Sequence, residues 1–253
     1  MIIDPGPSTG LDAVLAALGN RQPEAILLTH IHLDHAGGTG SLLARFPDLR
    51  VYVHEVGAPH VIDPSRLLSS AERLYGDQMQ RLWGEVLPVP EQNVTALSGG
   101  EIVAGLEVLY TPGHAGHHVS YLDPDSGDAF VGDVAGVRIP PGEVTLMPTP
   151  PPEIDVELWL ESIEALRTRR PERLHLTHFG TVDDADAQLD AAAERLRGQS
   201  ELARTGDQVA FMRKLGSLVD EQDADAAERM RQAMPLDQAW SGLERYWRKR
   251  GRG

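Results

Sequence analysis

The densest group of chemically active residues is the stretch Ala25–Gly38, which reads AILLTHIHLDHAGG. Its apolar start is typical of a short buried strand. Four side chains that can bind metal follow within six positions: His30, His32, Asp34 and His35. Imidazole and carboxylate together suit zinc, iron or manganese. The alternating spacing directs the first two histidines one way and the Asp-His pair another, which favours two adjacent metals over one.

Three later segments each place a candidate ligand after an expected strand. They are Thr111-Pro112-Gly113-His114, Phe130-Val131-Gly132-Asp133 and Leu176-Thr177-His178. In the first, the Pro-Gly pair lets the backbone turn sharply before the histidine. In the second, an aspartate follows an apolar run, and a buried carboxylate without a cationic partner would be costly. Metal binding would explain why a carboxylate stands at that place.

The segment THIHLDH resembles the H-x-H-x-D-H signature of the metallo-β-lactamase-fold hydrolase superfamily, which includes glyoxalase II, lactonases and RNase Z. The three later segments match further motifs of that family, in its order, and the resemblance covers roughly residues 1–197. It implies one metal bound by His30, His32, His114 and Asp133. It implies a second metal bound by Asp34, His35, His178 and Asp133, so that Asp133 bridges the two.

The function implied by this resemblance is a dinuclear metal-dependent hydrolase of a small ester, thioester, lactone or phosphoester. Two cations ~3.5–4 Å apart can hold a hydroxide at neutral pH and stabilise a developing oxyanion. Zinc is the expected metal, with manganese or iron as alternatives, and Asp34 is the expected proton acceptor and donor. Alternatives are a mononuclear-iron persulfide dioxygenase, an RNA-processing nuclease and a non-catalytic metal-binding scaffold.

The remaining histidines receive weaker assignments. By resemblance, His118 supports the ligands from outside the metal shell, as such donors commonly do. No role is assigned to His117, and His175 is interpreted as structural. His54 and His60 stand alone in the sequence and are typical of surface or satisfied core histidines.

Composition narrows the classes of partner. The 253 residues carry a formal net charge of −15, and the basic residues are scattered, which weighs against a nucleic-acid substrate. Cysteine is absent, so thiolate ligands and disulfides are excluded. No apolar run is long enough to cross a membrane, and the N-terminus has no export signal. We therefore expect a cytoplasmic enzyme with a small-molecule substrate.

Strands and helices alternate in both halves of the chain, as a four-layer αββα sandwich requires. We expect a catalytic domain over residues 1–206 and a helical C-terminal extension over 207–253. The extension should contain helices at Gln208–Val219, Ala224–Ala233 and Leu236–Arg248. Earlier helices are expected at Leu11–Leu18, Pro64–Trp83 and after Asp155. The proline-rich segment Pro140–Pro152 has no helical or strand-like periodicity of apolar residues. It is expected to be a long connection that forms a lid or pocket wall.

The beginning of the chain departs from the family pattern. Ile3-Asp4-Pro5-Gly6 resembles a family segment near the end of the third strand, and the two strands that normally precede it are missing. An exposed sheet edge is a pairing hazard. We therefore expect either a partner at this edge, most simply a second copy of the chain in a homodimer, or a longer natural start.

Overall fold

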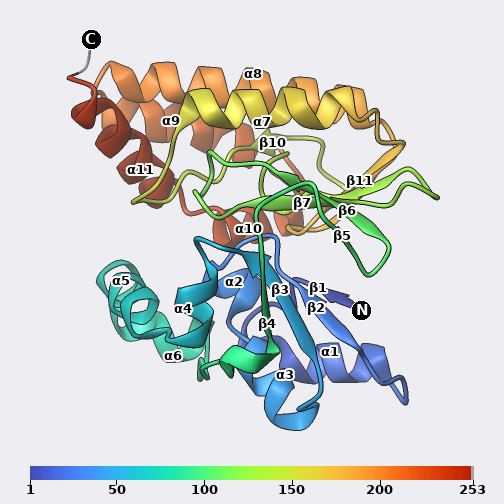
Figure 1. The fold of residues 1–253 in the computed structure, drawn as a ribbon. Coiled ribbons are helices and arrows are strands. Elements are labelled where there is room, and N and C mark those ends of the chain that lie inside the picture. The colour runs from blue at the N-terminus through green and yellow to red at the C-terminus, as the bar shows by residue number, and fades with distance from the viewer. Residues whose placement is uncertain (252–253) are drawn as a thin grey trace. The chain divides into compact units, whose positions relative to one another are not determined.

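The first four strands of the chain form a parallel sheet in the order β1-β2-β3-β4 (Figure 1). The computed structural model describes residues 1–251. The strands are β1 (Ile2–Ile3), β2 (Ala25–Leu27), β3 (Arg50–His54) and β4 (Val94–Leu97). Strands buried on both faces are apolar throughout, and Ile26 and Leu27 of β2 are fully buried. β1 is the outermost strand at one side of this sheet, and the expected partner for it stays a prediction.

Short helices connect these strands. They are η1 (Ser8–Gly10), α1 (Leu11–Leu18), α2 (Leu33–Ala36), α3 (Thr39–Arg45), α4 (Ala58–Ile62), α5 (Ser65–Tyr75), η2 (Gly76–Gln78), α6 (Met79–Leu82) and η3 (Glu91–Asn93). Apolar residues of α1 and α3 join one core cluster with those of β2 and β3. The prediction of a helix at Leu11–Leu18 is confirmed.

The prediction of one continuous helix over Pro64–Trp83 is wrong. The segment is divided into α5, η2 and α6. Gly76 has a φ of 47°, in the left-handed region that commonly ends a helix and that glycine adopts without steric cost. The apolar periodicity continues through the break, which is why the sequence pattern alone indicated a single helix.

The chain divides into two compact units. Unit 1 comprises Met1–Val108 together with His117–Val119, and unit 2 comprises Leu109–Gly116 and the chain from Ser120 onward. Strands β5 (Ile102–Val103) and β6 (Leu106–Tyr110) form a hairpin, and β6 carries the chain from the first unit to the second. Each unit therefore contributes its own secondary structure and its own core.

Unit 2 contains a mixed sheet. Its strands are β7 (Val119–Leu122), which begins at the unit boundary, β8 (Asp128–Phe130), β11 (Arg173–Leu176) and β12 (Gly180–Val182). β8 is antiparallel to β7 and parallel to β11, and β11 is antiparallel to β12. A separate pair, β9 (Val137–Arg138) and β10 (Thr145–Leu146), is also antiparallel. β10 lies within Pro140–Pro152, so this segment contains a short strand, and its expected role as a lid or pocket wall stays a prediction.

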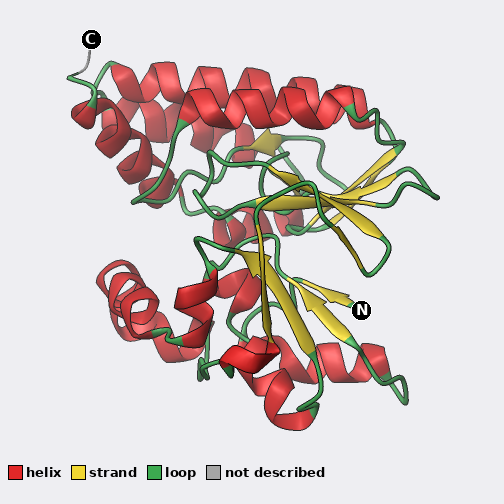
Figure 2. Ribbon diagram, viewed as in Figure 1, coloured by secondary structure: helices red, strands yellow, loops and turns green. Residues whose placement is uncertain are grey.

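Helices make up nearly all of the described chain after β12, as Figure 2 shows. The helices of unit 2 are α7 (Val156–Thr168), α8 (Ala185–Arg204), α9 (Gln208–Asp220), α10 (Ala224–Ala233) and α11 (Leu236–Lys249). The Asp155 carboxylate accepts a hydrogen bond from Leu158 N–H and caps α7 as predicted. The three helices predicted after residue 206 are confirmed to within one residue at each end.

The last three helices share a hydrophobic core with the rest of unit 2. Phe211 of α9 and Trp240 of α11 pack ring to ring at 5.4 Å and join the cluster that contains Trp159 of α7. A domain boundary at residue 206 stays a prediction, and residues 252 and 253 of the expected extension lie outside the described residues. None of the described helices is both long and apolar enough to cross a bilayer. The mixed α/β class predicted from the sequence is confirmed.

Candidate metal centre

The segment after β2 carries the first group of predicted ligands, and it lies in unit 1. Leu33–Ala36 form the one-turn helix α2, in which Ala36 N–H donates to the His32 carbonyl at 2.8 Å. His35 is fully buried, and the Asp34 side chain is 31% exposed. The helical turn sets the Asp34 Oδ2 atom 3.6 Å from His35 Nε2. A carboxylate and an imidazole thus present their ligand atoms together.

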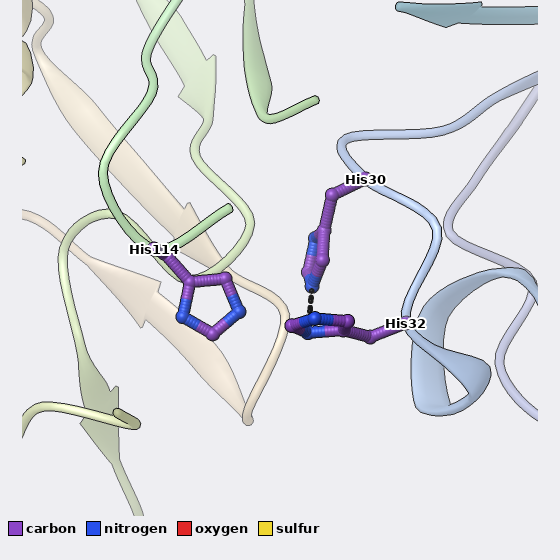
Figure 3. Close-up of side chains that lie close together, drawn as sticks. All are labelled: His30, His32 and His114. Carbon is purple, nitrogen blue, oxygen red and sulfur yellow. Dashed lines mark hydrogen bonds between the residues drawn. The ribbon is translucent and has the colours of Figure 1, made fainter. Parts of the chain in front are cut away.

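His30 and His32 form a second pair in the same segment. His30 is fully buried, and its Nε2 atom lies 3.0 Å from His32 Nδ1 (Figure 3). The two rings are nearly perpendicular, at 80°. Two ring nitrogens from histidines two positions apart therefore converge at the end of a core strand.

The carboxylate of Asp4 holds this segment in place. Its Oδ1 accepts the Thr29 backbone N–H at 2.8 Å, and its Oδ2 accepts the Thr29 hydroxyl at 2.6 Å. The same Oδ2 lies 2.8 Å from His35 Nδ1, and Thr29 Oγ1 lies 3.1 Å from His30 Nδ1. Because an ionised carboxylate only accepts, the proton of the neutral His35 ring is on Nδ1. The Thr29 hydroxyl donates its proton to Asp4, so it accepts a hydrogen bond from His30 Nδ1–H. The Nε2 atoms of His30 and His35 are therefore both unprotonated, and each has an electron pair for a metal ion.

Two further histidines of unit 1 surround this group. His118 is fully buried, and its ring centroid lies 5.1 Å from that of His30. His117 stacks on His30 at 6.2 Å and meets His32 edge-on at 5.9 Å. Val119 N–H donates to the Thr29 carbonyl at 2.7 Å, which fixes the 117–119 segment beside the ligand segment. The supporting role of His118 stays a prediction, and His117, to which no role was assigned, also contacts both rings of the pair.

His114 begins the group of predicted ligands in unit 2. Its Nδ1 atom lies 2.9 Å from the Pro148 carbonyl, which accepts the ring proton and leaves Nε2 as the electron-pair donor. The preceding turn is held by α7, because the Ser162 hydroxyl donates to the Pro112 carbonyl at 2.6 Å. Gly113 has a φ of 130°, and a Cβ atom there would lie 2.3 Å from the Trp159 Cα. The Pro-Gly turn is therefore required by close contact with α7 as well as by its backbone conformation.

Asp133 lies between two imidazoles of unit 2. Its side chain is 3% exposed, with Oδ2 at 3.4 Å from His114 Nε2 and Oδ1 at 3.5 Å from His178 Nε2. It follows β8 and the turn at Val131-Gly132, while His178 lies in the three-residue connection between β11 and β12. The ends of two parallel neighbouring strands thus bring the carboxylate and the imidazole together.

The donor atoms within each unit fit a metal ion. Two ligands at 2.0–2.1 Å from a tetrahedral zinc ion lie about 3.4 Å apart. The Asp133 contacts at 3.4 and 3.5 Å and the Asp34–His35 contact at 3.6 Å are close to this spacing. Ligating histidines usually donate their second ring N–H to a carboxylate or carbonyl, as His35 does to Asp4 and His114 to Pro148. In chemistry and in spacing, both groups are suited to divalent cations.

The histidines that were not predicted to be ligands have other partners. His175 Nε2 lies 3.3 Å from Asp128 Oδ2, its Nδ1 lies 3.0 Å from Thr181 Oγ1, and its ring stacks on Phe130. His54 is 3% exposed, and its Nδ1 accepts the Val56 N–H. Burial lowers the pKa of His54, against the smaller opposing effect of Glu55 and Glu101. These contacts agree with the structural interpretation of His175 and with a satisfied core histidine at position 54.

The sequence prediction missed the residues that orient the ligands. Asp4 was interpreted as part of a turn, and neither Thr29 nor the Pro148 carbonyl was assigned a role. Asp4 could have been found, because it is a carboxylate directly after a short apolar strand, the same signal that identified Asp133. The contribution of Pro148 is a backbone carbonyl, and no residue type identifies it.

The comparisons with known proteins agree with these findings. The profile of the metallo-beta-lactamase superfamily matches residues 1–178. The metallo-beta-lactamase fold-containing protein ST1585 of Sulfurisphaera tokodaii is 31% identical over 164 residues, 62% of this chain and 60% of that protein. A hydroxyacylglutathione hydrolase of Thermosynechococcus vestitus is 33% identical over 135 residues, 52% of this chain and 42% of that enzyme. The matched segments thus span about half the length of these relatives.

Solved structures show the same fold. The crystal structure of ST1585 from Sulfolobus tokodaii superposes with a TM-score of 0.68 at 24% identity, over 95% of this chain and 86% of that one. The crystal structure of TTHA1623 in a di-iron-bound form has a TM-score of 0.55 at 29% identity, over 76% of this chain and 86% of that one. The fold predicted from the motifs is confirmed. From the match over residues 1–178 and these relatives, the chain belongs to the metallo-beta-lactamase superfamily.

Proposed function

We propose that the protein is a dinuclear metal-dependent hydrolase of a small ester, thioester, lactone or phosphoester. The observation that supports this best is the buried Asp133 carboxylate, which lies 3.4–3.5 Å from the Nε2 atoms of two histidines. A carboxylate at 2% residue exposure is costly unless a cation or strong donors compensate its charge. In this proposal the ligands are those expected from the sequence: His30, His32, Asp34, His35, His114, Asp133 and His178.

The residues of the chain have distinct tasks in this proposal. Bound metal ions would supply Lewis acidity and lower the pKa of water to near neutrality. Asp34 is the least buried carboxylate of the set, at 31% side-chain exposure, and it can accept a proton at the reacting centre and release it to solvent. Asp4 and the Pro148 carbonyl hold the rings of His35 and His114 in orientation by accepting their Nδ1 protons.

The choice of metal and substrate rests on chemistry and on the relatives. Zinc is our first choice because it binds imidazole and carboxylate with no geometric preference of its own. Iron has support from the di-iron-bound form of the structural relative TTHA1623. Among substrates, a thioester has support because several relatives of similar identity are named hydroxyacylglutathione hydrolases.

The test is a panel of hydrolysis assays on matched metal-loaded protein. Samples loaded with zinc, manganese or iron are assayed on an activated ester, a lactone, a phosphoester and a hydroxyacylglutathione thioester. We expect hydrolysis of at least one substrate. Asp34→Ala and Asp133→Ala should each abolish it, because each removes a proposed ligand. Asp48→Ala, an exposed aspartate of the same chain, is the matched control and should retain activity.

Two outcomes would argue against a hydrolase. If no substrate is cleaved with any metal, the proposed function fails. If the iron-loaded protein instead consumes oxygen in the presence of a persulfide, the dioxygenase alternative replaces it. Undiminished hydrolysis in Asp133→Ala would contradict the proposed ligand set, although it would leave the reaction class intact.

A further inference from the structure

Phe179 has a backbone conformation that its side chain disfavours. The β11–β12 hairpin pairs Leu176 with Gly180, so its connection consists of three residues, Thr177, His178 and Phe179. Phe179 has a φ of +82°. Three-residue hairpin connections commonly end in a left-handed residue, and glycine is the usual choice because it has no Cβ atom. For a bulky side chain such a φ is a genuine outlier.

The folded structure gains little from a phenylalanine at this place. The residue is 54% exposed, so it buries little apolar surface in the core of unit 2. A single exposed apolar side chain is ordinary on a protein surface. The left-handed φ of Phe179, in contrast, costs free energy. Backbone outliers of this kind concentrate at functional sites. A glycine would serve the hairpin at lower cost, so a role other than folding explains the ring better.

The position of the ring indicates what that role is. Phe179 directly follows the proposed ligand His178, and the two ring centroids lie 6.1 Å apart in an edge-to-face arrangement. The neighbouring residue Gly180 approaches Pro140, since a Cβ atom at 180 would lie 3.4 Å from Pro140 Cγ. Pro140 is exposed as well. An exposed aromatic ring without polar atoms thus lies next to a proposed ligand, and an exposed proline approaches the residue that follows it.

We propose that Phe179 is a specificity-determining residue that selects substrates with an apolar acyl chain next to the bond that is hydrolysed. This rests on the proposed function, because it takes His178 as a ligand at the reacting centre. The ring would contact the acyl chain of an ester or thioester and contribute no hydrogen bond. A chain of about six carbons can cover one face of the ring, and burying such a contact is worth roughly tenfold in affinity.

The test compares acyl chain lengths in the zinc-loaded full chain. Hydrolysis is measured on acetyl and hexanoyl esters of one leaving group, and binding of the matching non-hydrolysable methyl and pentyl ketone analogues is measured by calorimetry. In the wild type, the hexanoyl-to-acetyl ratio of kcat/KM and the pentyl-to-methyl ratio of affinity should each be roughly ten. Both ratios should fall toward one in Phe179→Gly and in Phe179→Asn, whose side chain tolerates left-handed φ. Phe179→Trp should keep them.

Stability and metal content separate this role from a structural one. Phe179→Gly should raise the thermal midpoint by about 2 °C, because it relieves the backbone cost. Arg170→Gly is the matched control: Arg170 has a φ of +50° in the same unit and precedes β11, whereas the proposed ligand His178 follows that strand. It should raise the midpoint similarly and leave both ratios unchanged. Zinc content should be equal in all variants.

Each result decides the proposal. Unchanged ratios in Phe179→Gly, or analogues that do not bind to the wild type, would overturn it. Loss of zinc in Phe179→Gly would also overturn it, because the ring would then act by holding His178. If the wild type hydrolyses neither ester and no substrate of the metal-loaded panel, but binds the pentyl analogue more tightly in a Phe179-dependent way, the proposed function fails while the role of Phe179 stands.

Discussion

At the scale of single residues, one carboxylate orients the proposed ligand His35. Asp4 accepts hydrogen bonds from Thr29 and His35 and has a φ of 44°, a conformation that aspartate tolerates better than most residues. Its two carboxylate oxygens accept three hydrogen bonds. No other side chain of that size has two oxygens that both act only as acceptors. The position of Asp4 therefore requires a carboxylate, just as the proposed ligand positions require imidazole or carboxylate.

Replacing this carboxylate with an amide tests its role. In Asp4→Asn one end of the side chain becomes a donor, so either the Thr29 or the His35 hydrogen bonds are lost. We expect metal affinity to fall roughly 10–100-fold, as for other partners of metal-bound histidines. Competition with a chromophoric chelator measures this. Asp12→Asn, at an exposed position on α1, should bind metal like the wild type. Equal affinity in the two variants would show that Asp4 does not orient a metal-bound ring.

At the scale of elements, α7 determines where His114 lies. Trp159 Nε1–H donates to the Val134 carbonyl at 2.8 Å, and the ring meets His114 edge-on at 5.2 Å. The same helix approaches Gly113 so closely that no side chain fits between them. The helix, the His114 turn and the segment after Asp133 are thus held together within unit 2.

A single methyl group should disturb this arrangement. Gly113→Ala would require a left-handed φ of 130° for alanine and a Cβ atom 2.3 Å from the Trp159 backbone. We expect a loss of about 3 kcal/mol in the free energy of unfolding, in the range of other severe backbone substitutions. Denaturant titration measures it. Gly198→Ala is the control, since a Cβ atom added at this exposed glycine of α8 would meet no atom within 4 Å, and it should stabilise by about 1 kcal/mol. A Gly113→Ala protein as stable as Gly198→Ala would refute the argument.

At the scale of the whole molecule, the proposed ligands are divided between the two units. Unit 1 contains His30, His32, Asp34 and His35, whereas unit 2 contains His114, Asp133 and His178. If these residues bind two metal ions as proposed, bound metal stabilises the folded state of the protein. A ligand that binds only the folded state stabilises it in proportion to the logarithm of its concentration relative to Kd.

Metal removal should therefore destabilise the protein as a whole. At a free metal concentration about 1,000 times Kd each ion stabilises the folded state by about 4 kcal/mol, so loss of one ion should lower the thermal midpoint by about 10 °C and loss of both by about 20 °C. Calorimetry of chelated and zinc-restored protein should show this difference. Elemental analysis of the restored protein should find close to two metal ions per chain, as the paired ligand sets predict. In His35→Ala one of the two should be lost. A single ion in protein prepared with excess metal would contradict the dinuclear proposal.

The sequence alone determined which residue types could bind metal and which elements carry them. The histidines after β2, the turn before His114 and the aspartate after β8 were all recognisable, because metal chemistry restricts residue type and because strand ends are marked by apolar runs. Helices with a clear period and a capping aspartate, such as α7, were also predicted correctly. These signals lie within short stretches of sequence, so they can be recognised without knowledge of the fold.

Only the tertiary structure decided which residues support the ligands. The Asp4 carboxylate lies 25 positions from Thr29 and 31 from His35, and the Pro148 carbonyl lies 34 positions from His114. Contacts between residues so far apart in the sequence depend on how strands and helices pack. The pattern of residue types along the chain does not predict them. The left-handed φ of Phe179 is of the same kind. It is a backbone conformation that the surroundings impose against local preference.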